Sequence, residues 1–135
     1  FRVADRLLAS LDPDVKVVFV DFHAEATSEK QALGFYLDGR ASVVVGTHTH
    51  VQTADERVLP AGTGFITDVG MTGPYQSIIG MRTDKVVQRV LMQSKISFEV
   101  AKRDVRQAGV VVDIDEESGH ARRLERLLIA EDDQV

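Results

Sequence analysis

Apolar residues along this chain fall into segments that alternate between helical and strand-like spacing. They recur at helical intervals over residues 2–11 and 27–38. The runs 15–22 and 41–45 are instead short, continuous and rich in β-branched residues, which is typical of buried parallel strands. The order of strand, helix and strand with short connections predicts a βαβ unit, so both strands should end at the same edge of a sheet.

Local signals refine the boundaries of the second helix. The spacing from Ser28 to Gln31 matches a capping box and predicts that the helix begins near residue 27. Gly39 follows the last apolar residue and predicts where the helix ends.

The second half of the chain has mainly strand-like patterning. Residues 57–68 resemble a hairpin with a glycine-rich turn, and a loop over 69–79 follows. We expect a helix over about 85–94 and three further strands, at 96–101, 108–114 and 121–129, the last two joined by a turn at 115–120. The predicted fold class is α/β, with residues 1–135 in a single domain.

Composition narrows the functional classes. The net charge of −5 argues against a nucleic-acid surface, which needs clustered Lys and Arg, so no DNA partner is expected. No apolar run approaches the roughly 18 residues of a membrane span, and a cytoplasmic protein is the expectation. The chain has no cysteine, so any metal must be bound by imidazole and oxygen ligands.

Three histidines follow the predicted parallel strands. His23 ends the first strand run, while His48 and His50 follow the second with one residue between them. In an extended chain, residues i and i+2 point to the same side, roughly 6.6 Å apart. Strand exits at one sheet edge are where open α/β sheets bind ligands, so the sequence predicts a metal site at His23, His48 and His50. Imidazoles alone do not distinguish Zn, Fe, Mn and Cu.

Each candidate also has a structural alternative. A single strand-end histidine is more often a hydrogen-bonded residue at the rim of a core. Asp21 and Glu25 flank His23 and are candidates to orient its imidazole, although carboxylates here also serve as helix caps. Small residues over 67–74 let backbone N–H groups approach a phosphate, or simply form a tight loop. The substrate-binding candidates in this loop are Thr67, Gly70, Met71, Thr72 and Gly73.

Three motifs in order carry a family resemblance. The segments DFHAEATSEK (21–30), GTHTHVQTAD (46–55) and TDVGMTGP (67–74) closely resemble the YmdB-like metallophosphoesterases. These are calcineurin-type bacterial phosphodiesterases acting on 2′,3′-cyclic and, more variably, 3′,5′-cyclic nucleotides. The resemblance implies an αββα sandwich with two metal ions, iron or manganese first and zinc as an alternative. It also implies that His23 and His48 bind one metal ion and His50 the other.

Part of the family pattern is absent. Such enzymes carry a strand-end aspartate motif, a Gly-Glu-Asn motif with the bridging carboxylate, and a Gly-Asn-His motif with the proton-donating histidine. This sequence contains no asparagine at all, so it resembles the C-terminal half of the enzyme and has no catalytic residue of that kind. A bridging carboxylate offsets the repulsion between two metal ions. We therefore expect weak metal binding and little turnover from the 135-residue chain by itself.

The resemblance implies a function for the complete protein. That function is hydrolysis of cyclic nucleotides by attack of metal-bound hydroxide on phosphorus. The expected partners are a small phosphodiester substrate, the N-terminal half of the same domain and further copies of the protein, with no membrane. Two alternatives stay open from the residues: a mononuclear three-histidine zinc hydrolase, and a non-catalytic interaction module derived from the enzyme.

Overall fold

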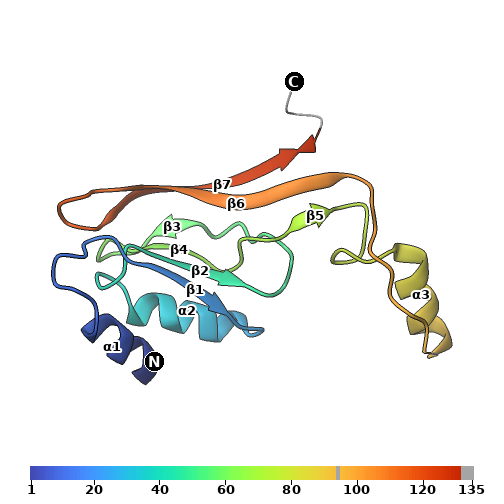
Figure 1. The fold of residues 1–135 in the computed structure, drawn as a ribbon, viewed down its shortest axis with the longest axis horizontal. Helices are drawn as coiled ribbons and strands as arrows, with labels where there is room; N and C mark the ends of the chain where they lie inside the picture. The colour runs from blue at the N-terminus through green and yellow to red at the C-terminus, as the bar shows by residue number, and fades with distance from the viewer. Residues whose placement is uncertain (94, 132–135) are drawn as a thin grey trace.

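Three layers of secondary structure stack on one another (Figure 1). The computed structural model describes residues 1–93 and 95–131. Helices α1 (Arg2–Ala9) and α2 (Thr27–Tyr36) cover one face of a sheet with strand order β1-β2-β4-β3, whose other face packs on a sheet of order β5-β6-β7. Helix α3 (Thr83–Met92) lies at one end, away from both sheets. The strands are β1 (Phe19–His23), β2 (Val43–Thr47), β3 (Arg57–Val58), β4 (Gly64–Ile66), β5 (Thr72–Pro74), β6 (Val105–Ile114) and β7 (Ala121–Ala130).

This arrangement confirms the predicted α/β fold class. The described residues supply an α layer and two β layers of the expected αββα sandwich. The helices and the two sheets enclose separate apolar clusters, one between α2 and the first sheet and one between the sheets.

Strand β2 is apolar over residues 43–45 because both of its faces are covered there. Val44 packs with Leu33 and Phe65 on the helical side. Val43 and Val45 point the opposite way and pack between the two sheets. All three valines are buried, which is the pattern of a central strand in a parallel sheet.

The predicted βαβ unit is confirmed. Strands β1 and β2 run parallel, with Phe19 opposite Val43 and His23 opposite Thr47. His23 therefore ends its strand beside the residue that precedes His48. The parallel register places both histidines at one edge of the sheet.

Strand β1 differs from its prediction in two ways. It begins at Phe19 rather than at residue 15, because β2 begins only at Val43 and the preceding residues have no partner strand. The carbonyl of Val18 instead accepts hydrogen bonds from the N–H groups of Ser42 and Val43. The strand is also not buried, because it lies at the edge of the sheet, where Phe19 is 62% exposed.

The helices agree with prediction in position but not in capping. Helix α2 begins at Thr27 as expected, yet Ala26 is its N-cap and no side chain caps it, so the capping box at Ser28 is wrong. The last residue predicted for α3, Ser94, lies outside the described residues. Within residues 1–93 and 95–131, no helix is long and apolar enough to cross a membrane.

Two segments of the second half also depart from prediction. The strand predicted over 96–101 is wrong, since only Val100 pairs, through an isolated bridge to Met81. A period-two pattern forms a strand only beside another strand, and Phe98 lies instead against the Arg89 guanidinium, 4.4 Å from the ring centroid. Conversely, the predicted loop over 69–79 contains β5, which pairs with β6.

One side chain ties the segment after the histidines to the second sheet. The Gln52 amide donates to the carbonyl of Gly109 in β6 at 2.9 Å and to that of Leu127 in β7 at 3.1 Å. An ion pair of 2.8 Å between Glu56 and Arg126 joins the same two layers. The loop that carries His50 is thereby held between the sheets.

A pair of strand glycines tests this packing. A Cβ on Gly46 would lie 1.7 Å from the Thr67 carbonyl oxygen, whereas a Cβ on Gly109 would meet nothing within 4 Å. We expect Gly46→Ala to lower the free energy of unfolding by about 3 kcal/mol or more. Gly109→Ala should change it by less than about 1 kcal/mol, because only backbone entropy differs. Urea unfolding curves measure both values, and equal effects would contradict the close packing at Gly46.

Candidate metal centre

Two of the three predicted histidines meet at the sheet edge. Nε2 of His23 lies 3.1 Å from Nδ1 of His48. Their ring planes are nearly perpendicular, with centroids 5.0 Å apart. Two ring nitrogens at this separation can both direct a lone pair at one divalent cation.

The surroundings of His23 determine which nitrogen is available. The Thr47 hydroxyl donates to the Asp21 carboxylate at 2.9 Å, so its oxygen accepts from Nδ1 of His23 at 3.0 Å. Nε2 then carries the lone pair of the neutral ring. Asp21 thus reaches His23 only through Thr47, a residue that sequence reasoning missed. Glu25 is exposed, and no hydrogen bond links it to either histidine among the described contacts.

His50 lies in a different environment. Its Nδ1 donates to the carbonyl oxygen of Ile79 at 3.0 Å, which leaves Nε2 as the free nitrogen. In residues 1–93 and 95–131, no three His, Cys, Asp or Glu side chains come close enough together to hold a metal ion. The structure therefore joins His23 to His48 and places His50 apart from them.

The separation follows from the backbone between the histidines. His48 has a φ of 120° and His50 a φ of 64°, so the expectation of an extended segment with both rings on one side is wrong. Positive φ in a residue other than glycine costs of order 1–3 kcal/mol and persists only where surrounding contacts enforce it. Such strain is typical of functional sites.

A buried carboxylate enforces this conformation. Oδ2 of Asp68 accepts the N–H of Thr49, between the two histidines, at 2.9 Å. The same oxygen accepts from Nζ of Lys30 at 2.8 Å, and Oδ1 accepts from the N–H of Gly70 at 3.0 Å. Both charged side chains are almost completely inaccessible, at 1% for Lys30 and 0% for Asp68.

The charge state of Asp68 follows from these contacts. Burial by itself would raise the pKa of the Asp68 carboxyl, but hydrogen bonds from Lys30, Thr49 and Gly70 outweigh it and hold the pKa below its ordinary value of 3.8. The carboxylate is therefore ionised at neutral pH. Sequence reasoning missed this pair, although Asp68 follows β4, a third strand that ends at the same edge of the sheet.

The predicted substrate-binding residues are distributed differently from expectation. Thr67 is buried and donates its hydroxyl to Asp55, and Gly70 donates its N–H to Asp68. Thr72 and Gly73 lie in β5 and pair with β6. Met71 lines a cavity that also contains His50. Of the five, Met71 is the residue that the structure places beside a predicted metal ligand.

The carboxylate that binds Thr67 is also ionised. Burial would raise the pKa of Asp55, but hydrogen bonds from Thr53 and Thr67 keep it below the ordinary value. The hydrogen bonds between Asp55 and Thr67 hold the start of the 67–74 loop in place. The loop is held as part of the same buried network that supports the histidines.

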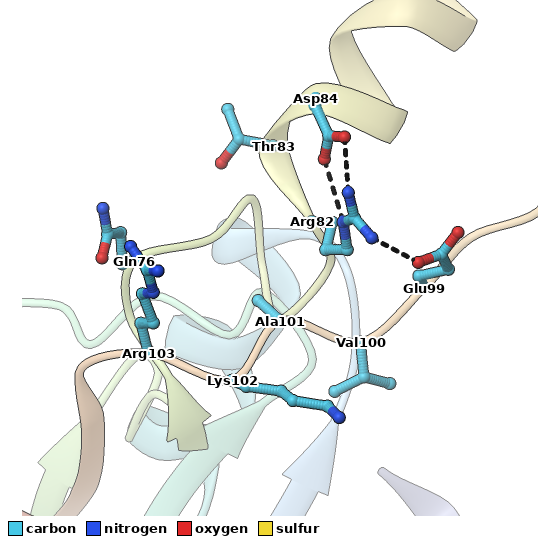
Figure 2. Close-up of a pocket in the computed structure, with 9 residues that line it drawn as sticks. All are labelled: Gln76, Arg82, Thr83, Asp84, Glu99, Val100, Ala101, Lys102 and Arg103. Atoms are coloured by element: carbon cyan, nitrogen blue, oxygen red, sulfur yellow. Dashed lines mark hydrogen bonds and ion pairs between the residues drawn. The ribbon is translucent and has the colours of Figure 1, made fainter.

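A larger cavity lies elsewhere, at the start of α3 (Figure 2). It measures about 550 Å³. Arg82 donates to Asp84 at 2.7 Å and to Glu99 at 2.6 Å, which joins the start of the helix to the segment that follows it. None of the predicted site residues lines this cavity.

Fold and site together define an α/β protein with paired imidazoles at the exits of parallel strands. The family model for YmdB-like proteins matches residues 1–127, and the chain belongs to this family.

Relatives and solved structures agree with this assignment. The chain is 54% identical to a 2′,3′-cyclic-nucleotide 2′-phosphodiesterase of Bacillus subtilis (strain 168), over 98% of this chain and 50% of that protein. It is similar to the crystal structure of a hypothetical protein from Thermus thermophilus, with a TM-score of 0.88 and 45% identity, over 96% of this chain and 50% of the other. It is also similar to a crystal structure described as a novel phosphatase from Mycoplasma pneumoniae, with a TM-score of 0.89 and 39% identity. That match covers 98% of this chain and 47% of the other. The chain spans about half the length of the curated relatives it matches.

The buried ion pair has a measurable contribution to stability. Lys30→Met should lower the free energy of unfolding at pH 7 by about 3–5 kcal/mol, because it leaves Asp68 buried without its counter-charge. Arg40→Met, at the half-exposed pair of Arg40 with Asp5, is the control and should cost about 1 kcal/mol or less. Denaturant unfolding measures both, and equal losses would contradict the role assigned to burial.

The same pair predicts a pH dependence. Because the pKa of Asp68 is lower in the folded than in the unfolded state, its contribution is fully present above about pH 4 and is lost as the pH falls through the folded value. Unfolding curves recorded at successively lower pH measure this loss.

Proposed function

We propose that this chain is part of a metal-dependent phosphodiesterase that hydrolyses 2′,3′-cyclic nucleotides and, as a second substrate class, 3′,5′-cyclic nucleotides. The observation that carries the proposal is the approach of His23 Nε2 to His48 Nδ1 at the carboxyl edge of the parallel sheet. The activity printed in the name of the Bacillus subtilis relative supports the substrate class.

The donor atoms fit first-row divalent metals. His23 and His48 would hold one ion and His50 the other, with iron or manganese proposed and zinc as the alternative. When bound, the ions would supply Lewis acidity toward the phosphoryl oxygens. Thr47 keeps the lone pair of His23 on Nε2, and the Ile79 carbonyl does the same for His50. The described residues bring no carboxylate into this group, so the centre needs an anionic ligand from outside them.

We propose that this ligand comes from an N-terminal half of the same domain. Strand β1 is an edge strand, and its Phe19 is 62% exposed. Phe19 lines one cavity with Leu7 of α1, which is equally exposed. A further parallel strand paired with β1 would end beside His23. In this proposal, residues 1–135 are the C-terminal portion of one domain. Self-association and a cytoplasmic location stay predictions from the sequence.

A mononuclear three-histidine zinc centre has less support. It requires His50 to join His23 and His48, whereas the hydrogen bond to Ile79 holds His50 apart. A binuclear centre is compatible with the observed positions, because the His23–His48 pair would bind one ion and His50 the other.

The proposal is tested on the complete protein. His48→Ala should lower both metal content and the rate of 2′,3′-cyclic AMP hydrolysis at least about 100-fold, because loss even of an outer hydrogen-bond partner of a ligand costs 10–100-fold. His120→Ala is the control, since His120 is exposed in the β6–β7 turn. Metal analysis and initial rates are the measurements. A His48→Ala variant with normal metal content and rate would overturn the proposal.

The incomplete centre leads to a second expectation. The purified 135-residue chain should bind Mn²⁺ at least about 10-fold more weakly than the complete protein, since three neutral imidazoles cannot offset the repulsion between two cations. Its hydrolysis of 2′,3′-cyclic AMP should be at background. Calorimetric titration with Mn²⁺ and single-turnover assays test this. Turnover comparable to that of the complete protein would contradict the assignment of a missing anionic ligand.

A further inference from the structure

The turn that supports His50 contains an unfavourable residue. Ile78 and Met81 exchange two backbone hydrogen bonds, of 2.9 and 3.0 Å, across a two-residue turn. Both central residues have positive φ, 47° for Ile79 and 97° for Gly80. Turns of this kind favour Asn-Gly, and a β-branched residue at positive φ is a conformational outlier. Isoleucine is thus a poor choice for the turn itself.

The hydrogen bond to His50 does not explain the isoleucine. Ile79 contributes only its carbonyl oxygen to that bond, and every residue type carries this atom. The side chain is 53% exposed, so it is not required for the core either. What distinguishes the side chain is its position, because it lines the cavity that contains His50.

The cavity offers mainly apolar surface. It measures about 320 Å³, at the lower end of the range typical of small-molecule sites, about 300–1,000 Å³. Its wall is formed by Met71, Tyr75, Ile79 and Leu128 together with Val51. Three of these side chains are strongly exposed although apolar, at 45% for Leu128, 53% for Ile79 and 60% for Val51.

Most polar side chains of the same cavity have a protein partner, whereas Nε2 of His50 is free. The Gln52 amide donates to backbone carbonyls of both β6 and β7, and the Ser77 hydroxyl bonds to the carbonyl of Pro74. The Tyr75 hydroxyl donates to the carbonyl of Met71, and Arg126 is paired with Glu56. A ligand would therefore meet mainly apolar side chains and a ring. This chemistry suits a flat, weakly polar group.

We propose that this cavity holds the nucleobase of the substrate, with Ile79 as a specificity-determining residue. The inference rests on the proposed function, because His50 at the cavity rim would place the phosphate of a cyclic nucleotide next to the metal centre. The base contacts Ile79, Met71 and Tyr75 by van der Waals contact. Bases are then distinguished by size, so purine nucleotides bind more tightly than pyrimidine nucleotides.

Substitution of Ile79 distinguishes the effect of its side chain on the turn from its effect on ligand binding in the cavity. Ile79→Asn gives the turn its favoured Asn-Gly sequence and keeps the carbonyl that binds His50, but removes the apolar side chain of Ile79 from the cavity wall. In the complete protein we expect a thermal midpoint of unfolding higher by about 2–4 °C. The KM for adenosine 2′,3′-cyclic phosphate should rise about 10-fold, with kcat within about twofold. Ile79→Val keeps a branched apolar side chain at the cavity, so its KM should rise much less than that of Ile79→Asn.

Comparison with a substrate that has no nucleobase tests whether the cavity recognises the base. For methyl riboside 2′,3′-cyclic phosphate, the KM of the parent protein should be higher than for the adenosine compound and should not change in Ile79→Asn. Equal KM values of the parent for both substrates, or an equal change for both in the variant, would overturn the base site.

Failure of the proposed function is recognised separately. It would appear as hydrolysis of neither substrate by the metal-loaded parent protein. Calorimetric titration of the metal-free protein with adenosine then still tests the cavity. Binding by the parent that is weakened in Ile79→Asn supports the inference, and no binding by the parent contradicts it.

Discussion

The arrangement of the site depends on one buried ion pair, between Lys30 and Asp68. Two charges removed from water are tolerated only when their remaining hydrogen-bonding capacity is satisfied. Asp68 meets this condition by accepting from Lys30 in α2, from Thr49 between the histidines and from Gly70 in the following loop. One carboxylate thus joins three segments distant in sequence. If the His48–His50 turn did not present the N–H of Thr49, the Asp68 carboxylate would be a buried charge with fewer hydrogen-bond partners.

The meeting of His23 and His48 was predictable because it depends on local pattern and topology alone. Two β-branched runs separated by a helix form a parallel pair, and parallel strands end at the same edge. His23 ends the first run, and His48 follows the second after Gly46 and Thr47. The strand register, in which His23 lies opposite Thr47, was a feature of this pairing that the pattern did not predict.

The position of His50 was not predictable from the same pattern. Spacing of two residues places side chains on one side only if the backbone is extended, whereas His48 and His50 both have positive φ. That conformation results from Asp68, which is 19 residues from Thr49 and binds its N–H. The failed strand over 96–101 has a related cause, since pairing depends on a partner strand and not on the pattern itself.

Strain is concentrated where the proposed chemistry would occur. Among the described residues, His48, His50 and Ile79 are three of the five non-glycine residues with positive φ, and His50 is hydrogen-bonded to Ile79. At about 1–3 kcal/mol each, their combined cost is a substantial part of the 5–15 kcal/mol by which domains are usually stable. The buried Lys30–Asp68 pair and the paired turn at Ile78 and Met81 hold these conformations through contacts within the chain. The same contacts therefore position the proposed metal ligands and the proposed base site.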